Sequence, residues 1–234
     1  WDKEGNDIDG EATGDNSGYD VSLNSDGTIV AIGARLNDGE SGDTNDNRGH
    51  TRIYEYNHST NLWTQMGDDI DGEAYRDFSG WSVSLNSDGT IVAIGAKLND
   101  GDSGNVDDDR GHTRVYKYNG SAWTQMGNDI DGENEEEYCG WSVDLNSSGT
   151  RLVVGCLYNT NETGEFAGAV KVYDWNGSDW VKVGESINAE VADDYFGDAV
   201  SISDDGKIVC GAASWNDDNG DKSGHVRIFI EKII

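Results

Sequence analysis

Acidic residues recur in this chain at a fixed spacing that suits a metal ion. The segments read D-I-D-G-E with a further acid four residues on, so that carboxylates fall at positions 1, 3, 5 and 9. Oxygen ligands at these positions, with a backbone carbonyl at position 7, are the spacing of a calcium loop. We therefore expect Ca²⁺ at one or more of three segments, with the candidate ligands Asp7, Asp9, Glu11, Asp15, Asp69, Asp71, Glu73, Asp77, Asp129, Asp131, Glu133 and Glu137.

These segments also depart from known calcium loops. The glycine falls at position 4 instead of 6, and position 5 is glutamate. A fourth segment, with Ser186, Asn188, Glu190 and Asp194, carries too little charge for a strong site. The alternative interpretation is a solvated acidic connection adapted to salty surroundings. A second set of candidate cation ligands lies in two longer acidic stretches, at Asp38, Glu40, Asp43, Asp100, Asp102, Asp107, Asp108 and Asp109.

The overall charge excludes several classes of protein. The 234 residues include 46 acidic and 16 basic side chains, which gives a formal net charge of −30. Such a chain repels phosphate backbones and anionic membrane surfaces, so we expect neither nucleic-acid binding nor membrane insertion. No apolar run approaches the roughly 20 residues that span a bilayer. The sequence begins at Trp1 without a signal-peptide pattern, which suggests a processed product or a segment of a longer protein.

Internal repeats reveal the elements that carry these acids. The stretch SLNSDGTIVAIGA occurs at 22–34 and again at 84–96. Alignment on Trp1, Trp63, Trp123 and Trp180 divides the chain into units at 1–62, 63–122, 123–179 and 180–234. We expect these units to form one domain over residues 1–234.

Each unit reads as four short strands. In the second unit, the alternating run 81–86 leads through a tight SDG turn into the apolar run 90–96. Further strands are expected at 112–119 and 123–127. The sequence therefore predicts an all-β fold, a four-bladed β-propeller of four-stranded antiparallel blades. The last unit lacks its outer strand, so we expect residues 1–5 to pair with 225–230 and close the ring.

The repeats resemble FG-GAP repeats, the blades of the integrin α-subunit propeller. The fourth unit carries the resemblance best, with Phe196-Gly197, Gly211-Ala212 and the strand GHVRIF at 224–229. In one respect the chain departs from that family: its calcium loop lies between the first two strands of a blade, where this sequence has only NSDG or NSSG. The resemblance therefore implies the fold, while the metal site of the family is absent from its usual place.

Most of the acid is expected on one face of the propeller. The connections from the outer strand of one unit to the first strand of the next, and those between the second and third strands, emerge on the same side of the disc. These two kinds of connection hold most of the acidic residues. Like-charge repulsion on that face favours the binding of cations.

Cysteines and N-x-S/T motifs suggest an extracellular protein. Cys139 and Cys156 stand at neighbouring ends of one predicted hairpin and are a candidate disulfide, while Cys210 is expected in the core. Candidate glycosylation sites are Asn57, Asn119, Asn146, Asn161 and Asn176. We therefore expect an extracellular or cell-surface location.

Recurring histidines and tryptophans have structural interpretations. His50, His112 and His225 open the third strand of their units, and such repetition argues against catalysis. Trp81 and Trp141 open first strands beside the acidic face. They are candidates for sugar stacking, although core packing is favoured.

These observations favour a non-enzymatic propeller module for adhesion or for surface or filament assembly. Its partners would be a protein or glycan ligand on the acidic face, or neighbouring subunits. The alternative is a carbohydrate-binding, lectin-like propeller. A glycoside hydrolase with paired carboxylates ranks last, because catalysis needs one asymmetric constellation and every acidic motif here is repeated.

Overall fold

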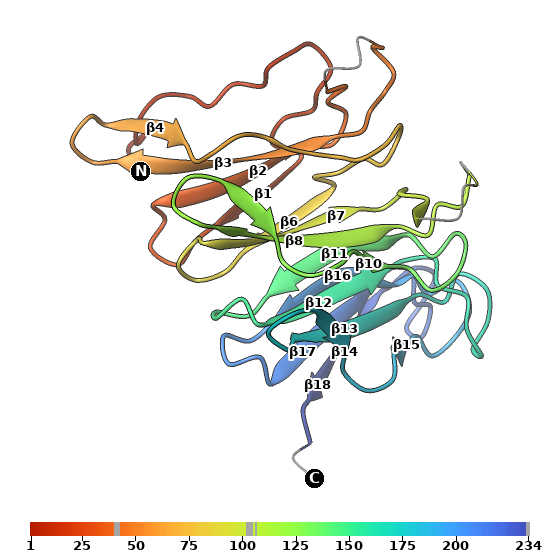
Figure 1. Ribbon diagram of the computed structural model, residues 1–234. Coiled ribbons are helices and arrows are strands. Elements are labelled where there is room, and N and C mark those ends of the chain that lie inside the picture. Colours follow the sequence, from red (N-terminus) through yellow and green to blue (C-terminus); the bar gives the residue numbers. More distant parts are fainter. Residues whose placement is uncertain (40–42, 102–104, 106, 233–234) are drawn as a thin grey trace.

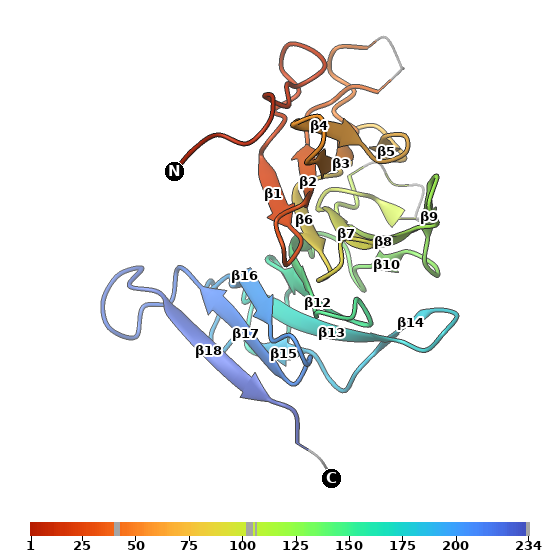
Figure 2. The same cartoon turned by 90° about the vertical axis from the view of Figure 1, so that its left-hand side faces the viewer.

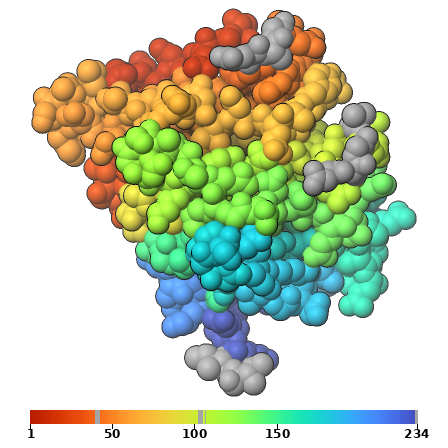
Figure 3. Space-filling view, viewed as in Figure 1, coloured from red at the N-terminus to blue at the C-terminus, as the bar shows by residue number. Residues whose placement is uncertain are grey.

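The computed structural model describes residues 1–39, 43–101, 105 and 107–232, which form four antiparallel sheets in sequence order (Figure 1). We call these sheets, with their connections, blades 1 to 4. The bounds of their strands are, for blade 1, β1 (Asp20–Leu23), β2 (Ile29–Ala34), β3 (His50–Asn57), β4 (Leu62–Gln65) and β5 (Ile70–Asp71); for blade 2, β6 (Ser82–Leu85), β7 (Ile91–Ala96), β8 (His112–Tyr118), β9 (Trp123–Gln125) and β10 (Ile130–Asp131); for blade 3, β11 (Cys139–Leu145), β12 (Arg151–Cys156), β13 (Ala169–Trp175), β14 (Trp180–Lys182) and β15 (Ile187–Asn188); and for blade 4, β16 (Phe196–Ile202), β17 (Ile208–Ala213) and β18 (His225–Ile230). The all-β prediction is confirmed, and the blades follow one another in sequence order from one end of the molecule to the other (Figure 3).

Each of the first three blades contains one strand more than the sequence predicts. In blade 1, the two-residue strand β5 pairs with β3 beyond the end of β4, with His50 opposite Asp71 and Thr51 opposite Ile70. The buried Ile70 anchors this short pairing in the core. The acidic connection therefore does not loop freely after the outer strand, because its first residues are fixed against the third strand of the blade.

Apolar residues from facing sheets form the cores between blades. Between blades 1 and 2, Ile29, Ala31 and Ile53 pack with Val83 and Leu85. Equivalent clusters lie between blades 2 and 3 and between blades 3 and 4. The apolar strand β7 of blade 2 is fully buried because blades 1 and 3 cover its two faces.

The predicted ring closure is wrong in this structure. Residues 1–5 form no strand, and β18 pairs with β17 and with no other strand of the described residues. The two ends of the chain lie at opposite ends of an open arc (Figure 2). Residues 1–5 instead lie along blade 1, where Glu4 accepts hydrogen bonds from the Tyr56 hydroxyl (2.6 Å) and, through its carbonyl, from Trp63 Nε1 (3.2 Å). Four blades stacked at this curvature do not bring blade 4 back to blade 1.

The candidate disulfide is present. Cys139 and Cys156 are bonded and occupy paired positions of β11 and β12. Cys210 is free and only partly buried on β17, so the expectation of a core position for it is wrong. The bond therefore fixes the start of the first hairpin of blade 3.

Candidate functional site

Two equivalent acidic pockets lie on blades 1 and 2. The blade 1 pocket has a volume of about 480 Å³ and is lined by Glu11, Asn37, Gly39, His50, Gln65, Asp68, Asp69 and Asp71. The blade 2 pocket has a volume of about 510 Å³ and is lined by Glu73, Gly101, Arg114, Gln125, Gly127, Asn128, Asp129 and Asp131. Each pocket combines acids from two successive connections, the one that enters the blade and the one that leaves it.

Short strand pairing builds the blade 1 pocket. The pairing of β5 with β3 places Asp71 opposite His50, and Gln65 at the end of β4 donates a hydrogen bond to Asp69 Oδ1 at 2.6 Å. Glu11 arrives from the connection before blade 1. Three carboxylates therefore converge on one imidazole: His50 Nδ1 lies 3.7 Å from Glu11 Oε2, 3.7 Å from Asp69 Oδ2 and 4.0 Å from Asp71 Oδ1.

His50 is neutral in this setting despite its acidic neighbours. Burial lowers the pKa of His50 below its usual 6.5, and the opposing effect of Asp69 and Glu11 is smaller. A neutral imidazole offers one nitrogen as an acceptor or a metal ligand. Glu11, His50 and Asp69 thus present two carboxylates and one nitrogen, with ligand atoms within 4.8 Å of one another.

In blade 2 an arginine neutralises the equivalent cluster. Arg114 donates from Nε to Asp129 Oδ1 at 2.9 Å and from Nη2 to Asp129 Oδ2 at 3.0 Å, and it also forms an ion pair with Glu73. His112 is buried and its Nδ1 makes no hydrogen bond with any residue that the structure describes, although Asp129 Oδ2 is 3.8 Å away. Burial lowers the pKa of His112 to about 4. Much of the charge that would attract a cation is already balanced in this pocket.

Arg52, at the same repeat position in blade 1, does not bind the aspartate of its pocket as Arg114 does. It donates from Nη2 to the backbone carbonyl of Asp9 at 2.7 Å, and its nearest carboxylate oxygen, Glu11 Oε1, is 3.6 Å from Nη1. No ion pair between Arg52 and Asp69 forms among the described residues. The blade 1 pocket is therefore more negative than the blade 2 pocket.

Blade 3 holds a fixed ammonium group where the other pockets are open. Lys171 occupies the repeat position of Arg52 and is fully buried. Its Nζ lies 2.9 Å from Glu137 Oε2 and 3.7 Å from Glu133 Oε1. Ala169 replaces the histidine at the start of the strand, so this blade presents no equivalent nitrogen. In blade 4, a more exposed group of Glu190, Asp218 and His225 forms instead.

The acids at position 9 of the predicted loops lie away from the pockets. Asp15, Asp77 and Glu137 are buried and accept hydrogen bonds from backbone N–H groups of their own connection, such as Ala12 N to Asp15 at 2.9 Å. An asparagine from the loop between the second and third strands of the same blade donates to this acid, as Asn37 does to Asp15 and Asn159 to Glu137. The four acids of one connection therefore do not converge on one point as the spacing suggested.

Other candidate ligands have different surroundings. Asp7 is exposed and forms an ion pair with Lys3 at 2.8 Å, and Glu133 binds Lys182 at 2.7 Å. Among the longer acidic stretches, Glu40 and Asp102 lie outside the described residues. Asp108 forms an ion pair with Arg110 at 2.6 Å, which neutralises part of the charge of this loop.

The contribution of the histidines to the acidic pockets is not evident from their sequence pattern. The repeated G-H pair at the start of the third strand was the available signal, and its repetition favoured a structural interpretation. What the sequence does not reveal is the short β5 strand, which brings an acid opposite that histidine. Only the pairing of the two strands identifies His50 as part of the acidic pocket.

The candidate sugar-stacking residues lie in an aromatic row along the first strands. The rings of Trp81 and Trp141 are 4.9 Å apart, and Lys97 Nζ lies 3.6 Å from the centre of Trp81. Burial lowers the pKa of Lys97 to about 8. Because cations and neighbouring rings cover Trp81, little of its face remains for a sugar.

A separate aromatic pocket lies between blades 3 and 4. It has a volume of about 220 Å³ and is lined by Trp141, Leu157, Tyr158, Tyr195, Asp198, Ser214 and Trp215. Leu157 stands at the repeat position of Lys97, but Lys222 Nζ lies 3.5 Å from the centre of the Trp215 ring and Lys97 Nζ lies 4.4 Å from that of Trp141. The exposed Trp215 borders this pocket.

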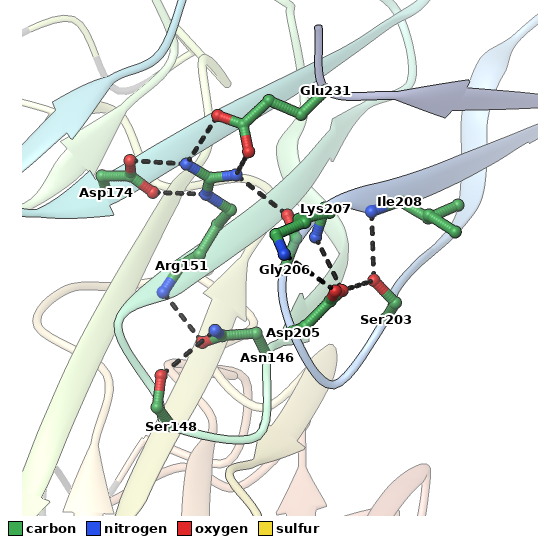
Figure 4. Close-up of polar contacts among 10 residues, drawn as sticks. All are labelled: Asn146, Ser148, Arg151, Asp174, Ser203, Asp205, Gly206, Lys207, Ile208 and Glu231. Atoms are coloured by element: carbon green, nitrogen blue, oxygen red, sulfur yellow. Dashed lines mark hydrogen bonds and ion pairs between the residues drawn. The ribbon is translucent and has the colours of Figure 1, made fainter. Parts of the chain in front are cut away.

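The candidate glycosylation sites divide by exposure. Asn57, Asn119 and Asn176 are exposed in the turns between third and outer strands, and Asn161 is partly buried. Asn146 is buried, and its amide nitrogen donates to Ser148 Oγ at 3.1 Å (Figure 4). Asn146 is therefore poorly placed for modification of the folded chain.

Comparison with known proteins supports the resemblance. Residues 190–229, in the fourth unit, match the model of the FG-GAP repeat, which confirms the suspected relation at the unit that carries the best motif. No curated protein matches the sequence.

Solved structures share the fold at low sequence identity. Hydrazine synthase of Kuenenia stuttgartiensis aligns with a TM-score of 0.55 at 14% identity, over 96% of this chain and 49% of that chain. A putative 6-phosphogluconolactonase from Bacteroides fragilis NCTC 9343 aligns with a TM-score of 0.54 at 13% identity, over 91% of this chain and 50% of that one. The chain thus spans about half the length of these structures, and the likeness concerns the fold alone. Among the described residues no helix has the length and apolar character needed to cross a membrane.

Proposed function

We propose that this chain is an extracellular, non-enzymatic propeller module for adhesion or surface assembly, and that it binds Ca²⁺ in the acidic pocket of blade 1. The observation that carries the proposal is the convergence of Glu11, Asp69 and Asp71 within 4.0 Å of His50 Nδ1. Ca²⁺ prefers six to eight hard oxygen ligands, and carboxylates and waters in a pocket of this size supply them.

The choice of Ca²⁺ rests on the ligand types. Carboxylate oxygens outnumber the single imidazole nitrogen in the pocket. An ion that binds imidazole strongly, such as Zn²⁺, is the natural comparison because it would draw on His50. An ion between the two connections would relieve the repulsion among the acids and link the entry to blade 1 with its exit.

The adhesive role rests on the relation to FG-GAP repeats and on the surface charge. The resemblance is to the blades of the integrin α-subunit propeller, and the acidic face offers a cation-dependent surface for a protein or glycan ligand. The exposed Asn57, Asn119 and Asn176 suit an extracellular chain.

Thermal unfolding in Ca²⁺ and in EDTA at matched ionic strength tests the cation site. An ion at a hundred times its Kd stabilises the folded state by about 2.7 kcal/mol, so Ca²⁺ should raise the Tm by several degrees. The variant Glu11→Gln should lose most of that rise. Equal melting of the wild-type chain in both conditions would contradict Ca²⁺ binding, and a rise with Zn²⁺ but not Ca²⁺ would contradict the choice of ion.

The aromatic pocket between blades 3 and 4 favours a second function, carbohydrate binding. Its rings, together with Asp198, match the combination of stacking surface and polar group that sugars require. A glycan array with the wild-type chain and Trp215→Ala tests this role. Binding by the wild type that is lost in Trp215→Ala would support carbohydrate binding at this pocket. An array on which the wild type gives no signal would contradict it.

A further inference from the structure

The open arc exposes apolar sheet faces at both of its ends. On blade 4, Val226, Ile228 and Ile230 of β18 are 63%, 68% and 69% exposed. On blade 1, Val21 and Leu23 of β1 are 57% and 59% exposed. Ordered rows of exposed β-branched and aliphatic side chains on a sheet indicate a surface that is covered by a partner.

Equivalent faces of neighbouring blades pack against each other inside the molecule. Ile228 and Cys210 occupy the repeat positions of Ile53 and Ala31, which blade 1 buries against blade 2. The residues that receive them on blade 2 are Val83 and Leu85, and their counterparts on blade 1 are Val21 and Leu23. The exposed face of blade 4 thus has the chemistry that the exposed face of blade 1 accepts.

A hydrogen bond that recurs between blades supports the same pairing. The backbone N–H of Leu85 donates to Ser22 Oγ at 2.9 Å, and that of Leu145 donates to Ser84 Oγ at 3.0 Å. In blade 4 the equivalent acceptor is Ser201. In blade 1 the equivalent donor is the N–H of Leu23. Blade 4 therefore carries the acceptor side of this contact, and blade 1 the donor side.

The N-terminal segment lies where the outer strand of a preceding blade would lie. Between neighbouring blades, Trp123 Nε1 donates to the Met66 carbonyl at 2.7 Å and Trp180 Nε1 to the Met126 carbonyl at 3.0 Å. Trp63 Nε1 makes the same bond to the Glu4 carbonyl. Residues 1–5 therefore lie where the outer strand of a blade before blade 1 would lie, although the described residues form no such blade.

Blade 4 has an uncovered sheet edge that such an outer strand would fit. Its sheet ends at β18, and no fourth strand covers this edge among the described residues. An uncovered sheet edge is a template for a strand of another chain.

We propose that a second copy of this chain docks head to tail, with blade 4 of one copy packed on blade 1 of the other. Residues 1–5 of the second copy then become the fourth strand of the β18 sheet. The register follows from the inner blades, where Tyr54 pairs with Gln65 and Tyr116 with Gln125. It places Phe229 opposite Lys3 of the second copy.

This contact joins different surfaces of the two copies, so it closes into a two-copy ring or continues as a filament. The net charge of −30 on each copy opposes association at low salt. We therefore expect association to strengthen as salt rises from about 0.05 M to about 0.5 M. The proposal does not depend on the cation pocket, because none of the docking residues lines it.

Sedimentation of the whole chain over a range of concentrations tests the proposal, with Leu23→Asp and Ile228→Asp as the variants. The wild-type chain should associate at micromolar concentration in about 0.5 M salt, and each variant alone should sediment as a monomer. A mixture of the two variants should associate again, because each retains the half that the other has lost. Val181→Asp, at an exposed apolar position on β14, is the matched control and should behave as the wild type.

The free thiol provides an independent readout on the unmodified chain. Cys210 lies on the blade 4 face beside Ile228, with the other two cysteines in the disulfide. Its reaction with a thiol reagent should slow severalfold as the protein concentration rises. A wild-type chain that stays monomeric at every concentration and salt level would overturn the proposal. So would a mixture of the two folded variants that stays monomeric while the wild type associates.

Discussion

Arg114 binds both carboxylate oxygens of Asp129, at 2.9 and 3.0 Å, whereas Arg52 at the same repeat position binds a backbone carbonyl. This one difference separates two otherwise similar acidic pockets. Where the arginine engages the aspartate, the protein supplies its own cation. Where it does not, the pocket retains the charge that would attract an ion from solution.

The substitution Arg114→Gln should convert the blade 2 pocket into a second cation site. Loss of the charge-assisted hydrogen bonds should destabilise the chain in EDTA by about 2 kcal/mol. Added Ca²⁺ should recover most of this loss, because Asp129 and Glu73 are then available to it. The measurement is the difference in Tm between Ca²⁺ and EDTA, which should exceed that of the wild type.

The control for this substitution is Arg151→Gln. Arg151 binds Asp174 of blade 3 and Glu231, which follows β18 of blade 4 (Figure 4), and it lines neither acidic pocket. Its loss should lower the Tm equally in Ca²⁺ and EDTA. A Ca²⁺ response of Arg114→Gln no larger than that of the wild type would contradict the role given to Arg114.

The buried carboxyl of Asp77 should make stability depend on pH. Burial raises the pKa of Asp77 from 3.8 to about 6, so the folded state holds this proton more tightly than the unfolded state. Both states are protonated below pH ~4, and between pH ~4 and ~6 this residue's contribution to stability falls as pH rises. A difference of about two pKa units corresponds to ~3 kcal/mol.

The variant Asp77→Asn isolates this effect. Its amide oxygen can still accept the hydrogen bonds that Glu73 and Ala74 donate from their backbone N–H groups to Asp77 Oδ2. Urea unfolding at pH 4 and pH 7 should show a smaller loss of stability in the variant than in the wild type. The control Asp221→Asn, at an exposed position, should lose as much stability as the wild type. An equal loss of stability in Asp77→Asn and in the wild type would refute the role given to Asp77.

The disulfide should contribute a few kcal/mol to the stability of the chain. Cys139 and Cys156 close a loop with a sequence separation of 17, for which the expected loss on removal is ~3 kcal/mol. The matched replacement is Cys139→Ser with Cys156→Ala, because other repeats carry serine and alanine at these positions. Dithiothreitol should lower the Tm of the wild type and leave that of the double variant unchanged. An unchanged Tm of the wild type in dithiothreitol would contradict a stabilising role of the disulfide.

Gly80 should tolerate no side chain because of a close contact between blades. Its φ is +80°, and an added Cβ would meet the His50 carbonyl at 2.5 Å. Gly80→Ala should therefore cost both the backbone strain and the clash, about 3 kcal/mol together. Gly120→Ala, with φ +98° and no atom within 4 Å, measures the strain alone. Equal losses by urea unfolding would show that the contact contributes nothing.

The repeats made most of the fold predictable, because each strand carries its own signal. The runs predicted at 90–96 and 112–119 correspond to Ile91–Ala96 and His112–Tyr118. The open arc was not predictable, since curvature depends on how whole sheets stack. The apolar face of blade 4 reads the same in sequence whether another blade covers it or not.

The site was predictable in composition and not in geometry. Acids at regular spacing identified the connections that matter, including Glu11 and Asp69. The spacing suggested that Asp15 joins them, but Asp15 is buried against Ala12 and Asn37, which are brought to it by tertiary structure. His50 enters the site only through the pairing of β3 with β5.

Calorimetric titration with Ca²⁺ of EDTA-treated protein tests the central claim most directly. Asp69 and Asp7 hold the same position in successive acidic segments, but Asp69 lines the pocket while Asp7 lies outside it beside Lys3. We expect the wild type and Asp7→Asn to bind Ca²⁺ alike and Asp69→Asn to bind at least tenfold more weakly, a difference of about 1.4 kcal/mol. Unchanged Ca²⁺ binding in Asp69→Asn would contradict it.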